Sequence, residues 1–494
     1  MMDRETLEYD FDEERGFGEP KTPDDVQDPH AGLNGAEKLG WGLIALGLLS
    51  LVIQVAGSPL TGTWLGFTSA ILLPAIGASI LFWGNLKDTN PGIKHDGVYF
   101  KSALSQGAVG WMLGIGFTAF YVLLYWYPTY LGHDPGGKNP TGLVAIVDPL
   151  ARVMTNYPAS QWFLYGVFYT LAIAVFGIRM IMKYRHNRYQ IIRTLSVTFF
   201  QFAFAWLLPN LLVYFRYPYM EFNGVWQLKH DYLWPSKVGE FLSAGAMGTF
   251  LLIFAVALVI ATPILTYFYG KRWYCSWVCG CGGLAETLGD PWRQLSSKST
   301  TAWKIERWMI HSVLVLVVAV TALLWAEYQW GILPGATGGY LKQWYGFAIG
   351  AVFSGVIGVG FYPLLGSRVW CRFGCPQAAI LGIFQRFFSR FRITTNGGQC
   401  MSCGNCSTYC EMGIDVRAYA QSGENIVRAS CVGCGVCSAV CPRGVLKLEG
   451  GTHADRFDGA SKPLTALIES LKEPDIYRYE SWDGHGAPPE RKKR

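Results

Sequence analysis

The C-terminal fold is decided by two stretches of sequence, Cys400-Met-Ser-Cys403-Gly-Asn-Cys406-Ser-Thr-Tyr-Cys410 and Cys431-Val-Gly-Cys434-Gly-Val-Cys437-Ser-Ala-Val-Cys441-Pro442. Each has four cysteines in the spacing C-x2-C-x2-C-x3-C, and only the second is followed by Pro. A C-x2-C-x2-C loop wraps three thiolates around three irons of a [4Fe–4S] cubane, so the fourth iron takes its ligand from elsewhere in the fold. The two runs therefore predict two [4Fe–4S] clusters.

The fourth cysteine of each run is expected to bind the cluster of the other run, as in two-cluster bacterial ferredoxins. We expect the ligands to be Cys400, Cys403, Cys406 and Cys441 for one cluster, and Cys431, Cys434, Cys437 and Cys410 for the other. Crossed ligation would join both runs into one small α+β domain, residues 394–447. Structural zinc usually uses two C-x2-C pairs, which argues against zinc here. Glu411 stands where the ferredoxin pattern often has Pro, so we expect a changed backbone near the second cluster.

The other five of the thirteen cysteines lie in two shorter motifs, Gly270-Lys-Arg272-Trp-Tyr-Cys275-x3-Cys279-Gly-Cys281 and Gly366-Ser-Arg368-Val-Trp-Cys371-x3-Cys375-Pro376. Both read G-x-R-x-aromatic-C-x3-C, and we interpret them as an internal repeat of a helical hairpin. C-x3-C thiols lie about one helical turn apart. Cys275, Cys279, Cys371 and Cys375 could therefore converge on a third redox or metal site. The alternative, buried thiols that bind nothing, stays open, as does the role of Cys281.

The composition is that of a membrane protein. Hydrophobic residues make up 51% and charged residues 15% of the chain, whereas soluble domains carry about 25% charged residues. A spanning helix needs about 20 apolar residues, and eight stretches qualify: 40–57, 64–84, 107–127, 161–182, 195–214, 242–269, 308–326 and 345–366. None of these cores contains Asp, Glu or Lys, which argues against ion transport. The net charge of +6 is modest and no nucleic-acid partner is expected.

Basic residues predict the orientation of the chain. Thirteen Lys and Arg lie in the loops after spans 2, 4 and 6, against six in the loops after spans 3, 5 and 7. Basic loops stay on the cytoplasmic side. With eight spans, both termini and the ferredoxin-type domain are then expected in the cytoplasm, with the lipid bilayer of the bacterial inner membrane around the spans.

The remaining segments complete the predicted domain organisation. Residues 1–38 form an acidic tail that we expect to be disordered, and residues 448–494 form a polar tail. Two four-span regions, 39–192 and 193–393, lie between the acidic tail and the ferredoxin-type domain, and the second carries both C-x3-C motifs. Residues 380–393, apolar and basic, predict a short helix lying on lipid.

Paired C-x3-C motifs after membrane helices, followed by a two-cluster ferredoxin domain, resemble the polyferredoxin-type membrane iron–sulfur proteins. This group includes the quinol-dehydrogenase subunit of periplasmic nitrate reductase systems, the nitrous-oxide reductase regulator and the cytochrome-oxidase assembly ferredoxin family. The resemblance covers roughly residues 193–445. Cys371-x3-Cys375-Pro376 fits the family motif, whereas Cys275-x3-Cys279-Gly280 lacks the Pro. The resemblance implies an electron-transfer subunit of a quinone-linked oxidoreductase complex, acting between quinone and a redox protein partner.

Two functions remain open at this stage. The leading one is electron transfer between the quinone pool and a redox partner through two [4Fe–4S] clusters. The alternative is a redox assembly factor that reduces a metal or a thiol during maturation of another metalloenzyme. No residue identifies a catalytic or quinone site, since Gln54, Gln201 and Asn210 in the spans are expected to form helix–helix hydrogen bonds. Haem is not expected, because only His311 falls within a span.

Overall fold

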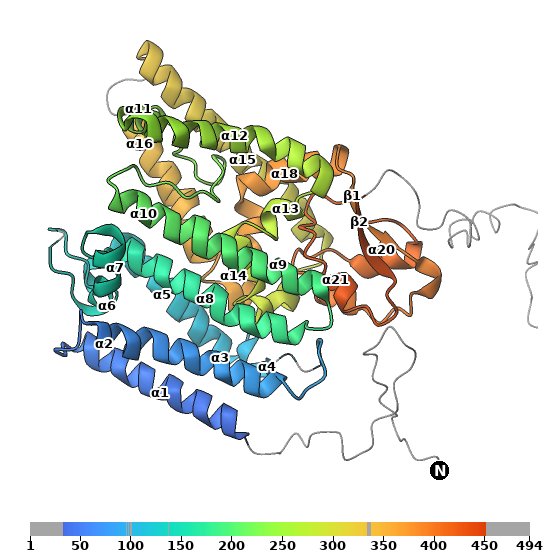
Figure 1. The fold of residues 1–494 in the computed structure, drawn as a ribbon. Helices are drawn as coiled ribbons and strands as arrows, with labels where there is room; N and C mark the ends of the chain where they lie inside the picture. Colours follow the sequence, from blue (N-terminus) through green and yellow to red (C-terminus); the bar gives the residue numbers. More distant parts are fainter. Residues whose placement is uncertain are drawn as a thin grey trace, which may run out of the picture.

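A computed structural model describes residues 33–450, apart from 95, 97, 99, 100, 137 and 333–336. Long helices lie side by side in one bundle, and a small domain of short helices and two strands lies at one end of it (Figure 1). Most of the two predicted tails falls outside the described residues. Helix α1 already begins at Gly35, because the Asn34 side chain accepts from Glu37 N and the Glu37 side chain accepts from Asn34 N, which is a capping box.

Within the described residues, seven helices are long and apolar enough to cross a membrane, and they match seven of the eight predicted stretches. They are α1 (Gly35–Val55), α2 with π-helical η2 and α3 (Trp64–Phe67, Thr68–Leu72, Leu73–Leu86), α5 (Ala108–Trp126), α8 (Gln161–Lys183), α9 with π-helical η4 and α10 (Arg188–Phe199, Phe200–Leu207, Leu208–Tyr214), α12 (Gly245–Tyr269) and α15 (Thr300–Trp330). The prediction of a polytopic helical membrane protein is confirmed.

The eighth predicted span, 345–366, is not among these helices. There the chain forms α16 (Thr337–Tyr345), π-helical η6 (Gly346–Ile357), a turn and α17 (Tyr362–Leu365). Glycines recur through this segment and Pro363 follows them, which disfavours a regular α-helix. Helix α16 contacts α15, and η6 contacts η7 (Trp370–Gly374), which contacts α15 again. The segment therefore runs back along α15 although it is no continuous α-helix.

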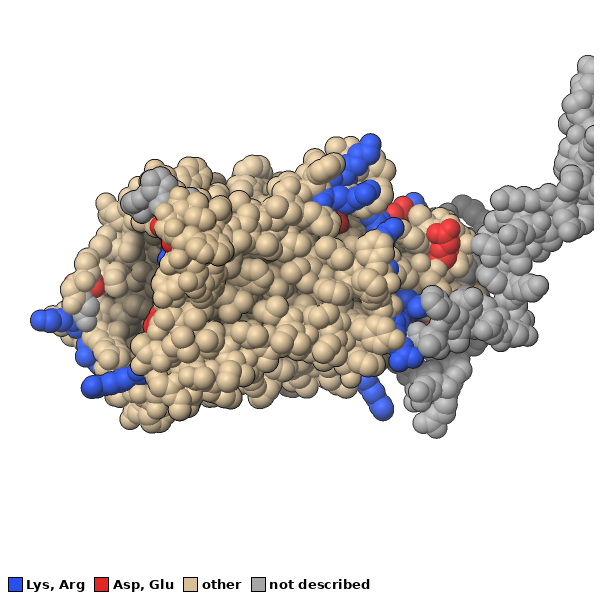
Figure 2. All heavy atoms as spheres, turned by 90° about the horizontal axis from the view of Figure 1, so that it is seen from above, with Lys and Arg blue, Asp and Glu red and all other residues tan. Residues whose placement is uncertain are grey.

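The two ends of the bundle carry the short elements. Helices α6 (Gly142–Ile146), α7 (Asp148–Thr155), α11 (Pro235–Ser243) and α16 lie at the end away from the strands, and α13 (Arg272–Cys275), α14 (Gly280–Glu286) and α18 (Pro376–Phe387) lie toward the strands (Figure 1). The remaining short helices are α4 (Lys101–Leu104), η3 (Pro128–Leu131) and η5 (Asp290–Leu295). Visible Lys and Arg gather at both ends, and the band between them shows almost no charge (Figure 2). A band without charged side chains is expected where a protein faces the hydrocarbon core of a bilayer.

The small domain is closed by an antiparallel pair of strands, β1 (Phe391–Thr395) and β2 (Leu446–Gly450), with Phe391 opposite Gly450. Between them lie η8 (Gly397–Gln399), α19 (Asn405–Thr408), α20 (Val416–Ser422) and α21 (Val436–Ala439). This is the predicted α+β domain. The helix predicted over 380–393 is shorter than expected, because α18 ends at Phe387 and residues 391–393 belong to β1. Leu381 and Gln385 of α18 are buried against the bundle and the small domain, whereas Phe387 and Phe388 are exposed, so contact with lipid stays a prediction.

Candidate iron–sulfur and thiol sites

One small cavity in the ferredoxin-type domain is lined by Cys400, Cys403, Cys406 and Cys441. The first three come from the first cysteine run and the fourth from the second, because α19 and α21 lie against each other. Each of these helices begins after a glycine in the left-handed region, Gly404 at φ 81° and Gly435 at φ 75°, which glycine adopts without steric cost. The four thiols thus lie around one space in the set that we expected for a cubane.

Cys410, the fourth cysteine of the first run, lies among the cysteines of the second run. Burial raises the pKa of the Cys437 thiol, and Cys434, Cys431 and Cys410 raise it further by their proximity. Such closely spaced thiols need a bound cation to ionise together, so this donor set also fits an iron–sulfur cluster. No group of three or more His, Cys, Asp or Glu side chains among the described residues is placed to hold a single metal ion. The assignment of ligands stays a prediction.

The two C-x3-C motifs have the same local geometry. Each follows a glycine with positive φ, Gly270 at 67° and Gly366 at 96°. Each then makes one short helical turn, α13 or η7, and its second cysteine is the extended residue that precedes the next helix. Cys279 precedes α14 and Cys375 precedes α18, where the Cys375 Sγ accepts from Ala378 N at 3.4 Å. This repeated path supports the interpretation of an internal repeat.

The four C-x3-C thiols are all buried, with 6–7% of each residue exposed. Burial raises the pKa of Cys275 and Cys375, and the Cys371 thiol raises both further, so the two motifs face one another. The Arg368 guanidinium lies 3.6 Å from the Cys371 Sγ. Cys281 is partly exposed, and the hydrogen bond from Cys279 lowers its pKa to about 7. The predicted thiols are therefore brought together at the end of the bundle.

The thiol motifs contact the second cysteine run directly. Ser276 Oγ, one residue after Cys275, donates to the Val432 carbonyl at 2.9 Å. Tyr189 OH and Gln190 Nε2 of α9 donate to the carbonyls of Gly433 at 2.8 Å and Cys434 at 2.9 Å. From α18, Gln385 Nε2 donates to the Cys431 carbonyl at 2.7 Å. The loop Cys431–Cys434 is thus held on the membrane bundle by four hydrogen bonds to its main chain.

A buried charge cluster lies beneath this contact. Asp290 pairs with Arg179 at 3.0 Å, Lys183 at 2.7 Å and Arg293 at 3.1 Å. Glu411 of the small domain is fully buried and pairs with Arg293 at 2.9 Å and Arg368 at 3.0 Å. Burial alone would raise the pKa of Glu411, but the two arginines hold it at about 2. The residue that departs from the ferredoxin pattern is therefore the anion that joins the small domain to the bundle.

A cavity of about 800 Å³ leads from the far end of the bundle to the thiol motifs. Cys279, Gly280, Cys281 and Tyr274 line it, as do Gln201 and Asn210 of the fifth span. The Gln201 amide donates to Thr170 on α8, as predicted, whereas Asn210 bonds to Trp206 of its own helix. Gln54, the third polar residue of the predicted spans, lies outside this cavity and donates from α1 to the Gly66 carbonyl of α2, which is a helix–helix hydrogen bond as predicted.

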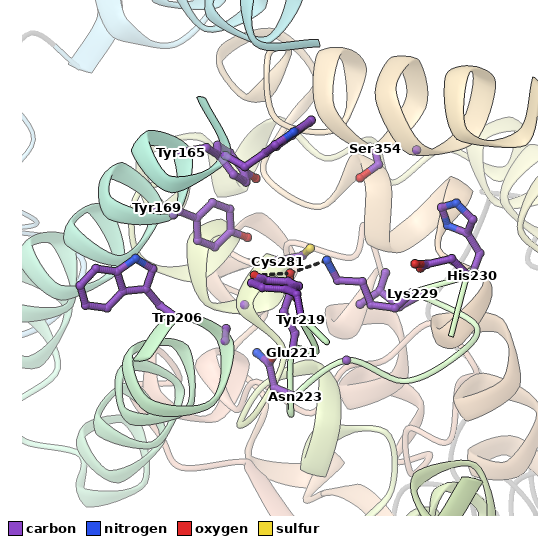
Figure 3. A pocket seen from close by; sticks show the side chains of 18 of the residues that line it. Tyr165, Tyr169, Trp206, Tyr219, Glu221, Asn223, Lys229, His230, Cys281 and Ser354 are labelled. Carbon is purple, nitrogen blue, oxygen red and sulfur yellow. Dashed lines mark hydrogen bonds and ion pairs between the residues drawn. The ribbon is translucent and has the colours of Figure 1, made fainter. Parts of the chain in front are cut away.

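Charged residues also enter this cavity from the connection 215–234, which folds back into the bundle. Its Asn223 carbonyl accepts from Tyr274 OH at 2.8 Å, beside the first thiol motif. Lys229 Nζ lies 2.6 Å from Glu221 Oε1, and both side chains lie in front of Cys281 (Figure 3). Neither Glu221 nor Lys229 belongs to a sequence motif, and in the sequence Lys229 is only one of the basic residues of a loop. The length of this connection and its many aromatic residues were the one feature of the sequence that indicated a loop folded into the bundle.

The fold and these sites define a class, the multi-pass membrane proteins with ferredoxin-type iron–sulfur domains. A 4Fe-4S dicluster domain model matches residues 399–446, and a 4Fe-4S binding domain model matches twice, at residues 248–299 and 347–394, which are the two halves of the repeat. The chain is 25% identical to YccM of Escherichia coli (strain K12), named for electron transport, over 40% of this chain and 54% of YccM.

Two further relatives match stretches of this chain of similar length, 180 and 158 residues. Regulatory protein NosR of Stutzerimonas stutzeri is 28% identical over 35% of this chain and 23% of NosR. Methylamine utilization ferredoxin-type protein MauN of Methylobacillus flagellatus is 27% identical over 31% of this chain and 53% of MauN. The chain thus spans about half or less of these relatives. No solved structure matches it significantly. The matches confirm the resemblance to polyferredoxin-type membrane proteins, and they place 4Fe-4S domains in the C-terminal half of this multi-pass membrane chain.

Proposed function

We propose that this chain passes electrons between the quinone pool and a redox protein partner through two [4Fe–4S] clusters. Cys400, Cys403, Cys406 and Cys441 would hold one cluster, and Cys431, Cys434, Cys437 and Cys410 the other. When bound, each cluster accepts and gives one electron. We further propose that Cys275, Cys279, Cys371 and Cys375 hold a third redox or metal centre, that the ferredoxin-type domain faces the cytoplasm and that the membrane is the bacterial inner membrane.

One observation carries this proposal. The loop Cys431–Cys434 rests on the residues that follow Cys275, through the 2.9 Å bond from Ser276 Oγ to the Val432 carbonyl. A domain that exchanged electrons only with soluble proteins would not need its cysteine loop buried against a membrane bundle. Hydrogen bonds and burial around cluster ligands also tune the reduction potential. The contact therefore favours electron flow between membrane and domain.

The test is the iron and acid-labile sulfide content of protein purified without oxygen, with low-temperature EPR after reduction. About eight irons per chain would support two clusters, and about twelve would add a third cluster at the C-x3-C motifs. Zinc with little iron would contradict electron transfer. Added quinol should reduce the clusters, and a chain whose clusters dithionite reduces but no quinol does would refute the quinone link.

A second function is favoured by one observation, the partly exposed Cys281 beside Cys279 on the wall of the 800 Å³ cavity. Thiolates of this kind bind soft metals and exchange with disulfides. This arrangement would suit a redox assembly factor. In that case Cys281→Ser should abolish reduction of an added metal ion or disulfide while the cluster EPR signals stay intact.

A further inference from the structure

The cavity enters the bundle at the end opposite the ferredoxin-type domain. The molecule is hollowed at this end, which carries α6, α7, α11 and α16 (Figures 1 and 2). Tyr157 and Trp162 line it near this end, and Cys279 and Cys281 line it at its depth. Its volume of about 800 Å³ falls in the range of sites for small molecules. A ligand could thus approach the thiol motifs without passing the ferredoxin-type domain.

Eleven of the residues that line the cavity are Tyr, Trp or Phe. Tyr165 and Tyr169 come from α8, Trp206 from η4, Tyr345 from α16 and Trp370 from η7. In Figure 3, Tyr165, Tyr169 and Trp206 line one side of the space, and Ser354 and His230 lie across it. Aromatic faces favour a planar, partly apolar ring, which stacks on them or meets their edges. They suit such a ring better than a small inorganic ion.

The charged groups of the cavity come from the connection 215–234, whose backbone is not helical. Non-helical backbone at membrane depth is tolerated where it lines a cavity or is buried in protein, and ionisable side chains there usually serve function. Burial alone would lower the pKa of Lys229, but Glu221 and nearby tyrosines hold it well above its usual value. Lys229 Nζ lies 2.6 Å from Glu221 Oε1, and Tyr219 OH lies 3.5 Å from the same oxygen.

We propose that this cavity binds the ring of a quinone or hydroquinone, with Glu221, held by Lys229, as the group that exchanges protons with a ring oxygen. This inference rests on the proposed function and assigns its quinone site. One hydroquinone becomes one quinone, two protons and two electrons. The two [4Fe–4S] clusters of the proposed function are the one-electron acceptors. Glu221 takes the protons in turn and releases each to water at the mouth of the cavity, and it supplies protons when the reaction is reversed.

Proton release at this end separates charge. Electrons leave toward the ferredoxin-type domain and protons leave at the opposite end of the bundle, so each turnover moves net charge across the membrane. In vesicles that hold the protein in one orientation, with a one-electron oxidant such as ferricyanide on the side of the ferredoxin-type domain to reoxidise the clusters, quinol oxidation should acidify only the opposite side. Acidification of the same side as that domain would overturn the assignment.

Binding is tested first, without reference to turnover. Decylubiquinone binding to the purified chain is measured by equilibrium dialysis for wild type, Ser354→Phe and Ser243→Phe. Ser354 lines the cavity, whereas Ser243 is exposed on α11 and does not. Ser354→Phe should weaken binding by about tenfold or more, because the added ring occupies the site, and Ser243→Phe should leave it unchanged. Equal binding by both variants would overturn the proposal.

Proton exchange is tested by Glu221→Gln against Glu240→Gln. Glu240 also pairs with a lysine, Lys237 at 2.9 Å, but on exposed α11. Glu221→Gln should slow the reduction of the clusters by decylubiquinol, seen as bleaching of their absorbance, by about a hundredfold. Quinone binding and bleaching by dithionite should stay unchanged in this variant. Glu240→Gln should match wild type in all three measurements. A wild-type rate in Glu221→Gln would overturn the site but not the proposed function. A wild-type chain that quinol cannot bleach, and that dithionite can, would overturn the proposed function itself.

Discussion

The Glu411 carboxylate lies 3.0 Å from the Arg368 guanidinium, with neither side chain exposed to solvent. Glu411 directly follows Cys410, and Arg368 lies three residues before Cys371. One ion pair therefore joins a ferredoxin-type cysteine run to a C-x3-C motif. It also explains the departure from the ferredoxin pattern, because a Pro at 411 would leave Arg368 and Arg293 without this anion.

Replacement of Glu411 should uncouple the two parts of the molecule. Glu411→Gln removes one of the two carboxylates that pair with each guanidinium, since Arg293 keeps Asp290 and Arg368 keeps Glu286. Leaving a buried charge without any partner costs about 3–5 kcal/mol of unfolding free energy, so we expect a loss of about 3 kcal/mol or less here. Thermal unfolding in detergent, followed together with iron content, measures the effect. Glu424→Gln, on the exposed side of the same domain, is the control and should stay within about 0.5 kcal/mol of wild type. Equal stability of the two variants would show that the buried pair does not hold the domain.

The close approach of the second cysteine run should depend on Gly433. Its φ is 63°, and a Cβ there would lie 2.7 Å from the Arg272 Cβ. Gly444 has a similar φ of 58°, with open space around it. Both alanine variants carry the cost of a left-handed residue, about 1 kcal/mol, but only Gly433→Ala also pushes the cysteine loop off the bundle. We expect Gly433→Ala to be the less stable and to slow cluster reduction by quinol, with Gly444→Ala near wild type in rate. Identical rates would argue that this contact is not on the electron path.

Crossed ligation makes a pairwise prediction. Cys400→Ser and Cys441→Ser should remove the same cluster signal from the EPR spectrum, because both residues line one cavity. Cys431→Ser and Cys410→Ser should remove the other signal. Uncrossed ligation would instead pair Cys410→Ser with Cys400→Ser. Spectra of the four variants under dithionite separate the two schemes, provided that each retains about four irons.

Much of this architecture could be predicted because its signals are local. Apolar length marks a spanning helix whatever its neighbours are, so seven predicted spans coincide with helices of the structure, although some ends differ by up to eight residues. The spacing of Cys400 to Cys441 reflects the geometry of one cofactor. The repeat of Gly270 and Gly366 before paired cysteines could also be read from sequence, since both glycines have the positive φ that turns the chain into the motif.

The rest depends on contacts between distant segments, which no local pattern encodes. The spans lack Asp, Glu and Lys in their cores, yet the interior is charged, because the connection 215–234 carries Glu221 and Lys229 inward. Arg293 and Glu411 are 118 residues apart and meet only when the small domain docks. The apolar residues of α18 resemble those of a lipid-facing helix, yet one face of α18, with Leu381 and Gln385, is buried in protein, while Phe387 stays exposed. Apolar sequence alone cannot tell protein from lipid as a neighbour.

The reactivity of Cys281 should report whether the first thiol motif is empty. In protein treated with a chelator to free the C-x3-C thiols, the hydrogen bond from Cys279 lowers the pKa of Cys281 to about 7 from an ordinary value of 9.0. The thiolate is the reactive form, so alkylation should rise with pH to half its maximum near pH 7. Mass spectrometry of the labelled peptide over a pH series measures this midpoint.

Cys279→Ala removes the donor and should move the midpoint up toward the ordinary value, whereas Cys375→Ala, at the equivalent position of the other motif, should leave it near 7. A midpoint near the ordinary value in all three proteins would mean that Cys279 does not donate to Cys281. Before chelation, a metal bound by Cys279 would take up its thiolate and abolish the hydrogen bond, so a difference between the two samples would itself indicate a bound metal.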